Sequence, residues 1–296
     1  MNIRKAIYQI YRHFMLDCCH WKIVDREWVA TKGYKVDWEN PRDINEKIQW
    51  LMCFSDTSLW SLCADKYRVR DYVKAKGFGD MLVPLYGVWD KASEIDFDIL
   101  PEKFVLKCNH DSGSTVIIDK AAGFDESAVR RGLAAHLRAK YGYVHGEMYY
   151  NDIRPCIMAE KYLEPESSVS ASQVDYKIWC FGGKPYGILT CHGRTRDSVC
   201  LNAYDLEWNV HPEWSVFSEH YRDGRGELPR PAHLDEMLSA ASVLSEGFPE
   251  VRVDFYEVGG RVYFGELTFS SLCGKMTYYT EDYLRELGRQ CILPRK

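Results

Sequence analysis

The stretch Val251-Arg-Val-Asp-Phe-Tyr-Glu-Val-Gly-Gly-Arg-Val-Tyr-Phe-Gly-Glu-Leu-Thr268 predicts two alternating strands joined at Gly259-Gly260. Each strand carries an acid, Asp254 on the first and Glu266 on the second. If both acids share a face with Arg252, their hard oxygen ligands could bind a divalent cation such as Mg2+. The alternative is a solvated strand face that carries a surface ion pair.

The register of this hairpin decides which face each acid occupies. A two-residue turn would pair Val258 with Arg261 and put the acids on opposite faces, because a slip of one residue turns every side chain over. A three-residue loop would pair Glu257 with Arg261 and put both acids on one face. We expect the three-residue loop, since it separates polar from apolar positions better. The face that holds the acids would then comprise Arg252, Asp254, Tyr256, Val262, Phe264, Glu266 and Thr268.

The composition is that of a folded, enzyme-sized protein. The chain has 296 residues, of which 46% are hydrophobic and 14% aromatic, enough for one or two packed domains. Its net charge of −5 argues against nucleic acid as the main partner. No apolar run reaches the roughly 20 residues that span a bilayer, and the N-terminus lacks a secretory signal, so we expect a cytoplasmic protein. The eleven cysteines are scattered without a C-x-x-C pair and are expected to be small buried hydrophobes.

Four regions follow one another along the chain. We expect a helical region over 1–62, an α/β subdomain over 63–103, a central lobe over 104–163 and a C-terminal lobe over 164–296. A single helix is predicted over 63–76. Strands arrive as hairpins and not as regular βαβ units, which favours an α+β fold with antiparallel sheets.

The N-terminal helix is amphipathic. Its apolar side chains recur at helical spacing, and basic residues stand between them. Such a helix could touch an anionic membrane surface at the inner face. We expect it instead to pack on the body of the protein. The apolar positions are Ile3, Ile7, Ile10, Tyr11 and Phe14.

A lysine and a small polar loop suggest a phosphate site. Lys107 ends a predicted strand and is followed by Asn109-His-Asp-Ser-Gly-Ser-Thr115. Glycine and serine let backbone N–H groups approach phosphate oxygens, and the lysine adds a positive charge. The segment is neither a Walker loop nor G-x-G-x-x-G, and an ordinary hairpin turn would explain it as well.

Two further strands carry polar residues at or near their ends. The apolar strand from Cys156 leads to Glu160, and this acid or Glu166 could reach purine or ribose groups. Lys177 lies in an alternating strand and faces either a ligand or solvent. In isolation, solvated charges at a strand end explain each of them.

Four more residues are candidates for substrate contacts. His192, Arg194 and Arg196 follow a returning strand and could hold an anionic group. His110 could contact a ligand, although no nucleophile motif surrounds it. A surface loop explains the first three about as well.

Taken in chain order, four segments resemble the ATP-grasp superfamily, and most closely its teichuronopeptide-biosynthesis (TupA-like) branch. The resemblance covers roughly residues 40–280 and implies two α+β lobes that grip ATP between antiparallel sheets, with N-terminal helices in front. The matching segments are Asp65-Lys-Tyr-Arg-Val-Arg70, Phe104-Val-Leu-Lys-Cys-Asn-His-Asp-Ser-Gly113, Asp175-Tyr-Lys-Ile-Trp-Cys-Phe-Gly-Gly-Lys-Pro185, and Arg252-Val-Asp-Phe-Tyr with Tyr263-Phe-Gly-Glu-Leu-Thr268.

The resemblance also implies residues for the nucleotide. Lys107 would bind the α- and β-phosphates, and the loop from Asp111 to Thr115 would close over them. Lys177 would be a second phosphate contact, while Lys66 matches the branch motif without an assigned role. The loop contributes Ser112, Gly113 and Ser114, and the adenine side would be formed by Glu160 and Leu163, with Glu166 near the ribose.

For the metal, the resemblance implies that Asp254 and Glu266 coordinate one or two Mg2+ ions, and that Arg252 steadies the transferring phosphoryl group. The superfamily commonly has Asn two residues after the metal-binding Glu. This chain has Thr268, which the branch tolerates and whose hydroxyl can still ligate.

The chemistry implied is ATP-dependent carboxylate–amine ligation through an acyl phosphate. The branch points to an amino acid joined to a uronic-acid carboxylate in surface or capsular polysaccharide assembly. Two alternatives stay open. A glycosyltransferase would use a metal held by Asp96-Phe-Asp98, and a non-catalytic ATP-grasp-like protein would keep only the fold.

Overall fold

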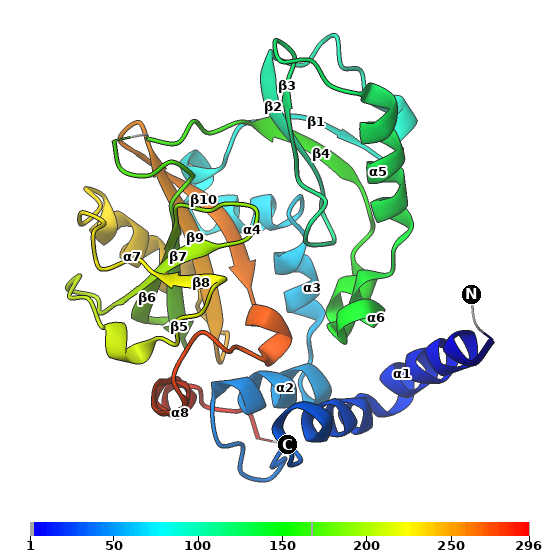
Figure 1. Ribbon diagram of the computed structural model, residues 1–296, viewed down its shortest axis with the longest axis vertical. Coiled ribbons are helices and arrows are strands. Elements are labelled where there is room, and N and C mark those ends of the chain that lie inside the picture. The colour runs from blue at the N-terminus through cyan, green and yellow to red at the C-terminus, as the bar shows by residue number, and fades with distance from the viewer. Residues whose placement is uncertain (1–2, 167, 296) are drawn as a thin grey trace.

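The computed structural model describes residues 3–166 and 168–295, which form two sheets with separate hydrophobic cores (Figure 1). The four-stranded sheet has the order β1-β4-β2-β3, and the six-stranded sheet has the order β10-β9-β5-β6-β7-β8. All neighbours are antiparallel except β7 and β8, so the α+β class is confirmed. The strands are β1 (Leu85–Trp89), β2 (Lys103–Cys108), β3 (Val116–Asp119), β4 (Ile157–Lys161), β5 (Asp175–Phe181), β6 (Lys184–His192), β7 (Val199–Tyr204), β8 (Tyr221–Asp223), β9 (Val251–Val258) and β10 (Arg261–Thr268).

Helices cover the outer faces and close the base of the molecule. In Figure 1 the helix α5 lies against the four-stranded sheet, and α7 lies against the six-stranded sheet. The C-terminal α8 packs on α2 at the base. The helices are α1 (Ile3–Lys32), α2 (Ile44–Phe54), α3 (Ser58–Ala64), α4 (Val69–Ala75), α5 (Glu126–Arg138), α6 (Tyr141–His145), α7 (Leu234–Leu244) and α8 (Glu281–Gln290).

The single helix expected over 63–76 is wrong, because the chain breaks at Asp65. The Asp65 carboxylate accepts hydrogen bonds from the backbone N–H groups of Tyr67 (2.9 Å) and Arg68 (3.1 Å) and from the side chain of Asn109 (2.9 Å). An aspartate that binds the backbone two and three residues ahead competes with the helix and starts a turn. The helices α3 and α4 therefore meet at this buried side chain.

The strand that we placed in a separate 63–103 region joins the central lobe. Backbone hydrogen bonds pair β1 with β4, for example Trp89 with Ile157, so β1 forms one edge of the four-stranded sheet. The four-region division of the chain stays a prediction, but this sheet draws strands from two of its regions.

The three-residue loop predicted for the 251–268 hairpin is wrong. Val258 pairs with Arg261 across a two-residue turn, which is the register that separates the two acids. A β-bulge at Gly265 then shifts the register by one residue, so Asp254 pairs directly with Glu266. The shared face is therefore correct for a different reason. Val262 and Phe264, which we expected on that face, pair with Glu257 and Phe255.

The bulge makes Gly265 a sensitive position. A Cβ atom there would lie 3.0 Å from the carbonyl oxygen of Asp254 and 3.2 Å from Cε2 of Tyr256. We expect Gly265→Ala to destabilise the protein by about 1–2 kcal/mol in urea unfolding, because this backbone contact has little room to relax. Gly132→Ala is the control, since that exposed helical site is open. Equal stability of Gly265→Ala and wild type would contradict the role of the bulge.

All eleven cysteines lie within the described residues and are free, which confirms that the chain has no disulfide framework. Most of them are buried among apolar side chains. Within residues 3–166 and 168–295, no helix is both long and apolar enough to cross a bilayer.

One buried acid is not balanced by a hydrogen bond. Glu250 precedes β9 and is fully buried, and within the described part of the chain neither of its carboxyl oxygens has a hydrogen-bond partner. Burial raises the pKa of Glu250 well above its ordinary value, so the folded protein holds the neutral acid. The unfolded chain ionises this group above about pH 4.5, and there the folded protein binds the extra proton.

Wild-type stability should therefore fall as pH rises from about 4.5 towards the folded pKa of Glu250, by roughly 1.4 kcal/mol per pH unit for this one group. We expect Glu250→Gln to remove this contribution and to be more stable than wild type near pH 7. Urea unfolding across pH 4–8 measures the difference. The exposed, nearby Glu246→Gln serves as control. Parallel pH profiles for Glu250→Gln and wild type would contradict the prediction.

Candidate nucleotide and metal site

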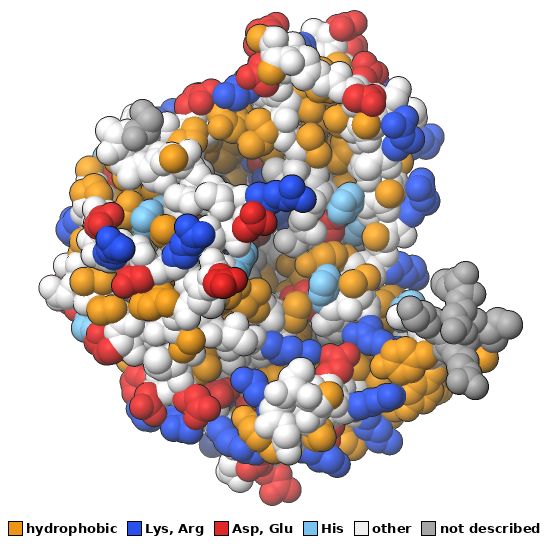
Figure 2. Space-filling model, in the orientation of Figure 1, with side chains coloured by type: hydrophobic (Ala, Val, Ile, Leu, Met, Phe, Trp, Pro, Cys, Tyr) orange, Lys and Arg blue, Asp and Glu red, His pale blue; other side chains and the backbone are white. Residues whose placement is uncertain are grey.

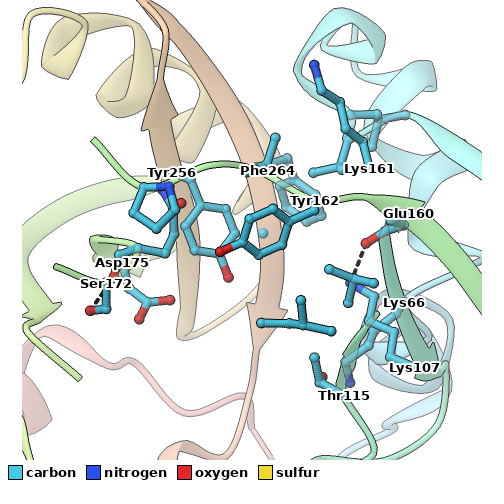
Figure 3. A pocket seen from close by; sticks show the side chains of 18 of the residues that line it. Lys66, Lys107, Thr115, Glu160, Lys161, Tyr162, Ser172, Asp175, Tyr256 and Phe264 are labelled. Atoms are coloured by element: carbon cyan, nitrogen blue, oxygen red, sulfur yellow. Dashed lines mark hydrogen bonds and ion pairs between the residues drawn. The ribbon is translucent and has the colours of Figure 1, made fainter. Parts of the chain in front are cut away.

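A pocket of about 490 Å3 lies between the two sheets. Figure 2 shows the surface hollowed between the lobes, and Figure 3 shows the side chains that line the hollow. Val105 and Ile117 form an apolar wall from the four-stranded sheet, and Phe264 and Leu82 form another from the opposite side. Apolar walls with a few convergent charges are typical of a site for a small molecule with a flat ring.

Two cations pair with one acid at the base of the pocket, and a third lies in the same pocket. Lys107 Nζ lies 2.5 Å from Glu160 Oε2, and Arg70 Nη1 lies 3.4 Å from Glu160 Oε1. Glu160 is a buried residue of β4, and its side chain lines the pocket, as Figure 3 shows. Lys66 is the third cation and lines the same pocket. The positive charge exceeds the negative charge here, which suits an anionic ligand.

Sequence spacing gave Lys66 no role, and the structure shows which groups surround its ammonium group. Its ammonium group donates to the backbone carbonyl of Asp111 (2.6 Å). Burial lowers the pKa of Lys66, and the charge of Glu266 opposes this shift while that of Lys107 adds to it. Lys66 therefore lies between the cations at the base of the pocket, such as Lys107, and the acids of the hairpin, such as Glu266.

Lys177 and the two acids of the hairpin, Asp254 and Glu266, form a row across three strands. Lys177 on β5 is the register partner of Asp254 on β9, and Asp254 is the register partner of Glu266 on β10. The Lys177 ammonium lies 2.6 Å from Asp254 Oδ2, and Arg252 donates to both Asp254 oxygens at 2.7 and 2.8 Å. Although burial raises the pKa of Asp254, the charges of Arg252 and Lys177 hold it below its ordinary value.

Glu266 is less constrained than Asp254. Its side chain is 43% exposed, accepts from the Thr268 hydroxyl at 3.2 Å and lies 3.8 Å from Arg252. Arg252 also donates to Thr268 Oγ1 (3.1 Å) and to Ser271 Oγ. The threonine hydroxyl thus links the arginine to Glu266, which is not itself among the residues that line the pocket.

These residues fit a shared magnesium ion better than a complete protein cage. Among the residues that the structure describes, no three or more His, Cys, Asp or Glu side chains are grouped to hold a metal. Mg2+ is commonly held by one or two carboxylates together with substrate phosphates and water. Asp254 and Glu266 would provide that pair beside the pocket, next to its lining residue Gly265, although neither acid lines the pocket itself.

The loop from Asp111 to Thr115 is anchored from within. Ser114 donates to Asp111 Oδ1 (2.5 Å) and accepts from the backbone N–H of Cys108 (2.9 Å). The other Asp111 oxygen lies 2.6 Å from Nδ1 of His136 on α5. Ser114 is therefore buried in the loop, whereas Ser112 and Gly113 are exposed at its tip and Thr115 lines the pocket. No pattern in the sequence indicates that these polar groups form hydrogen bonds with one another.

Several predicted contacts lie elsewhere. His110 is buried, with Nε2 3.3 Å from the carbonyl of Ala139, and burial lowers its pKa. His192 lies 3.4 Å from Asn202 and is not among the pocket side chains. The exposed Arg196 is not among them either.

Glu166 is also outside the main pocket. It accepts from the backbone N–H of Gly259 (2.7 Å) and lines a second, smaller pocket. Leu163 and Arg194 do line the main pocket, and Arg194 is paired with Asp175 at 3.3 Å.

Sequence reasoning missed two pocket residues. Tyr256 projects from β9 into the pocket beside Asp175, as Figure 3 shows, and Arg70 reaches Glu160 from α4. The alternation of β9 places Tyr256 two positions after Asp254, and Arg70 lies four positions after Lys66. Both spacings can be read from the sequence. Neither indicates a pocket, because the pocket forms only when the two lobes come together in the folded chain.

Two lobes with a pocket between them that is lined by Lys66, Arg70 and Lys107 are the arrangement expected of an ATP-grasp protein. The family model TupA-like ATPgrasp matches residues 46–292. The chain belongs to this family.

Solved structures give more distant matches. The D-alanine–D-alanine ligase from Bacillus anthracis complexed with ATP is 16% identical with a TM-score of 0.39, over 70% of this chain and 54% of that one. The ATP-grasp ligase PsnB complexed with minimal precursor is 11% identical with a TM-score of 0.40, over 76% and 60%. PsnB with a phosphomimetic precursor variant, Mg and ADP is 11% identical with a TM-score of 0.40, over 92% and 66%. The chain thus spans between about half and two thirds of these proteins, and the comparison with curated proteins gave no match.

Proposed function

We propose that the protein is an ATP-dependent carboxylate–amine ligase. The observation that carries the proposal is the row of Lys177, Asp254 and Glu266 across three strands. None of the three lines the pocket, but the row lies next to the lining residues Asp175 and Gly265, and the charge of Glu266 acts on Lys66, which lines the pocket together with Lys107. Cations in an apolar pocket with paired carboxylates next to it suit the triphosphate of ATP and its magnesium ion. The adenine would then occupy the apolar end between the sheets.

The proposed reaction has two displacements. A substrate carboxylate oxygen attacks the γ-phosphorus, the bond to the β–γ bridging oxygen breaks, and ADP leaves. The amine nitrogen then attacks the acyl carbon of the acyl phosphate, phosphate leaves with the former carboxylate oxygen, and the amine loses a proton. No protein nucleophile is needed, so positioning and charge neutralisation supply the rate enhancement.

The chain's own residues have separable roles in this reaction. Lys107 and Lys66 would hold phosphate oxygens from the central lobe, and Arg252 would neutralise the transferring phosphoryl group. Asp254 and Glu266 would hold magnesium, which when bound supplies further neutralisation of phosphate charge. Lys177 keeps Asp254 ionised and in place through its 2.6 Å contact.

The finer proposal concerns the substrates. We propose an amino acid as the amine and a uronic-acid carboxylate as the acceptor, in surface or capsular polysaccharide assembly in the cytoplasm. Its support is the branch of the superfamily to which the chain belongs. Arg194, paired with Asp175 at the edge of the pocket, is the residue best placed to meet an anionic sugar.

No structural observation favours the glycosyltransferase alternative. Asp96 accepts from the backbone N–H of Asp98 at 3.0 Å, and Phe97 between them is buried in the core of the central lobe. Both acids are exposed and neither lines the main pocket.

The test is incubation of the full chain with ATP, Mg2+, amino acids and uronates. We expect ADP release that requires both an amine and a carboxylate, together with a product of the combined mass less water. Release of UDP from a sugar nucleotide while ATP stays inert would establish the glycosyltransferase instead. ATP that binds without any turnover across both substrate panels would favour the non-catalytic alternative.

A further inference from the structure

The helix α1 consists of two halves that meet at a sharp kink. Cys19 has non-helical angles (φ −149°, ψ 53°) inside the helix. Arg12 lies 3.1 Å from Glu27, and Arg26 lies over the ring of Tyr8, so the halves approach one another across the kink. The N-terminal half projects from the rest of the molecule in Figure 1.

The second half of α1 packs on the body, as we expected for the whole helix. Val24 and Trp28 are buried in a small cluster with Val36. The first half touches the body along one side only. There Leu16 is buried, Arg12 donates to the backbone carbonyl of Tyr143, and His13 lies against the Tyr143 ring at 4.3 Å.

The opposite side of the first half is apolar and open. Ile7, Ile10, Tyr11 and Phe14 are 61%, 71%, 47% and 62% exposed. Their spacing of three and four residues places them on one side of a helix, and at 100° per residue that side faces away from Arg12 and Leu16. In Figure 2 hydrophobic side chains gather on α1 at the lower right.

Charge indicates what this face meets. Between Met1 and Lys35 the chain has seven Lys and Arg against three Asp and Glu, a formal charge of +4, whereas the whole chain carries −5. The N-terminal segment is therefore opposite in net charge to the chain as a whole. We propose that the first half of α1 binds an anionic lipid surface, lying along it with this apolar face inserted between headgroups.

Two observations favour lipid over a second copy of the chain. A symmetric pairing of this segment would bring two +4 segments together, and their repulsion opposes association. Tyr11 on the exposed face combines an apolar ring with a polar tip, which suits the headgroup level of a bilayer. The proposal rests on α1 alone, so its outcome is independent of the ATP-dependent reaction.

The test is co-sedimentation of the full chain with vesicles. We expect binding to mixed phosphatidylglycerol and phosphatidylcholine vesicles, weaker binding as salt is raised, and little binding to phosphatidylcholine alone. The variant Ile10→Glu/Phe14→Glu should reduce the partition coefficient by at least about tenfold, since two large apolar side chains leave the interface. Both positions are exposed, so the fold should be unaffected.

The matched control is Ile99→Glu/Val144→Glu, which changes two side chains that are 73% and 63% exposed outside α1. It should bind vesicles as wild type does. Equal binding of wild type and Ile10→Glu/Phe14→Glu would overturn the proposal, as would failure of wild type to bind anionic vesicles. A dimer that light scattering detects in wild type and that Ile10→Glu/Phe14→Glu abolishes, without vesicle binding, would instead show that a second copy covers the face.

Discussion

Replacing Glu266 by Gln should lower ADP release by about a hundred- to a thousand-fold at saturating substrate, the size of effect seen when one charge-stabilising group is lost from an active site. The amide keeps the shape of the side chain but removes the charge that would hold magnesium. Because the side chain is 43% exposed and its contacts to Thr268 and Arg252 lie at 3.2 and 3.8 Å, we expect stability to change by less than about 1 kcal/mol.

Glu257→Gln is the matched control for this experiment. Glu257 is on the same hairpin, accepts from the backbone N–H of His233 at 3.1 Å and lines the second pocket instead of the main one. Its ADP release should stay within a few-fold of wild type. Raising the Mg2+ concentration should restore part of the ADP release that Glu266→Gln has lost. It should not change the ADP release of Glu257→Gln. Normal turnover in Glu266→Gln would show that this side chain does not hold the metal.

Replacing Asp254 by Asn should remove both activity and stability. Asp254 is buried and is the acid nearest to Arg252 and Lys177, with contacts of 2.6–2.8 Å. Loss of its charge leaves two buried cations without their main partner, which typically costs about 3–5 kcal/mol. Urea unfolding at pH 7 measures this loss, and circular dichroism shows whether the variant still folds.

The stability difference should depend on pH in a defined direction. The folded pKa of Asp254 is lowered, so its contribution is fully present above the ordinary aspartate pKa and is lost as pH falls through the folded value. Wild type and Asp254→Asn should therefore converge below about pH 4. Asp175→Asn is the control, because Lys177 keeps Asp254 when the 3.5 Å contact to Asp175 is removed. An equal loss in both variants would contradict the central place of Asp254.

How far the sequence predicts the site is clearest at the hairpin. Alternation and Gly259-Gly260 were enough to predict both strands and the acids they carry. The shared face, however, depends on the bulge at Gly265, which periodicity alone does not reveal. A glycine within a strand permits such a bulge without requiring it, since the partner strand decides whether an extra residue is accommodated.

The N-terminal helix also shows where prediction from the sequence ends: the sequence predicts an apolar face but not whether that face is buried. Its spacing predicted an apolar face over Ile3, Ile7, Ile10, Tyr11 and Phe14. The side chain of Ile3 lies outside the described part of the structure, and the other four form that face. Whether the face is covered by the body depended on the kink at Cys19 and on contacts with Tyr143, more than a hundred residues away. We expected cover because apolar faces are usually buried, and for the first half of α1 that expectation is wrong.

The sequence alone determined the local features: the α+β class, and the two strands of the hairpin that carry Asp254 and Glu266. The tertiary structure alone decided that Lys177 joins them in one row, that Lys66 lies beside them, and that His110 and Ser114 serve the packing of the loop. Caps and alternation act over a few neighbouring residues and leave a pattern in the sequence. Sheet neighbours and lobe contacts bring together residues as far apart as Lys66 and Glu266, and only the folded chain specifies which of them meet.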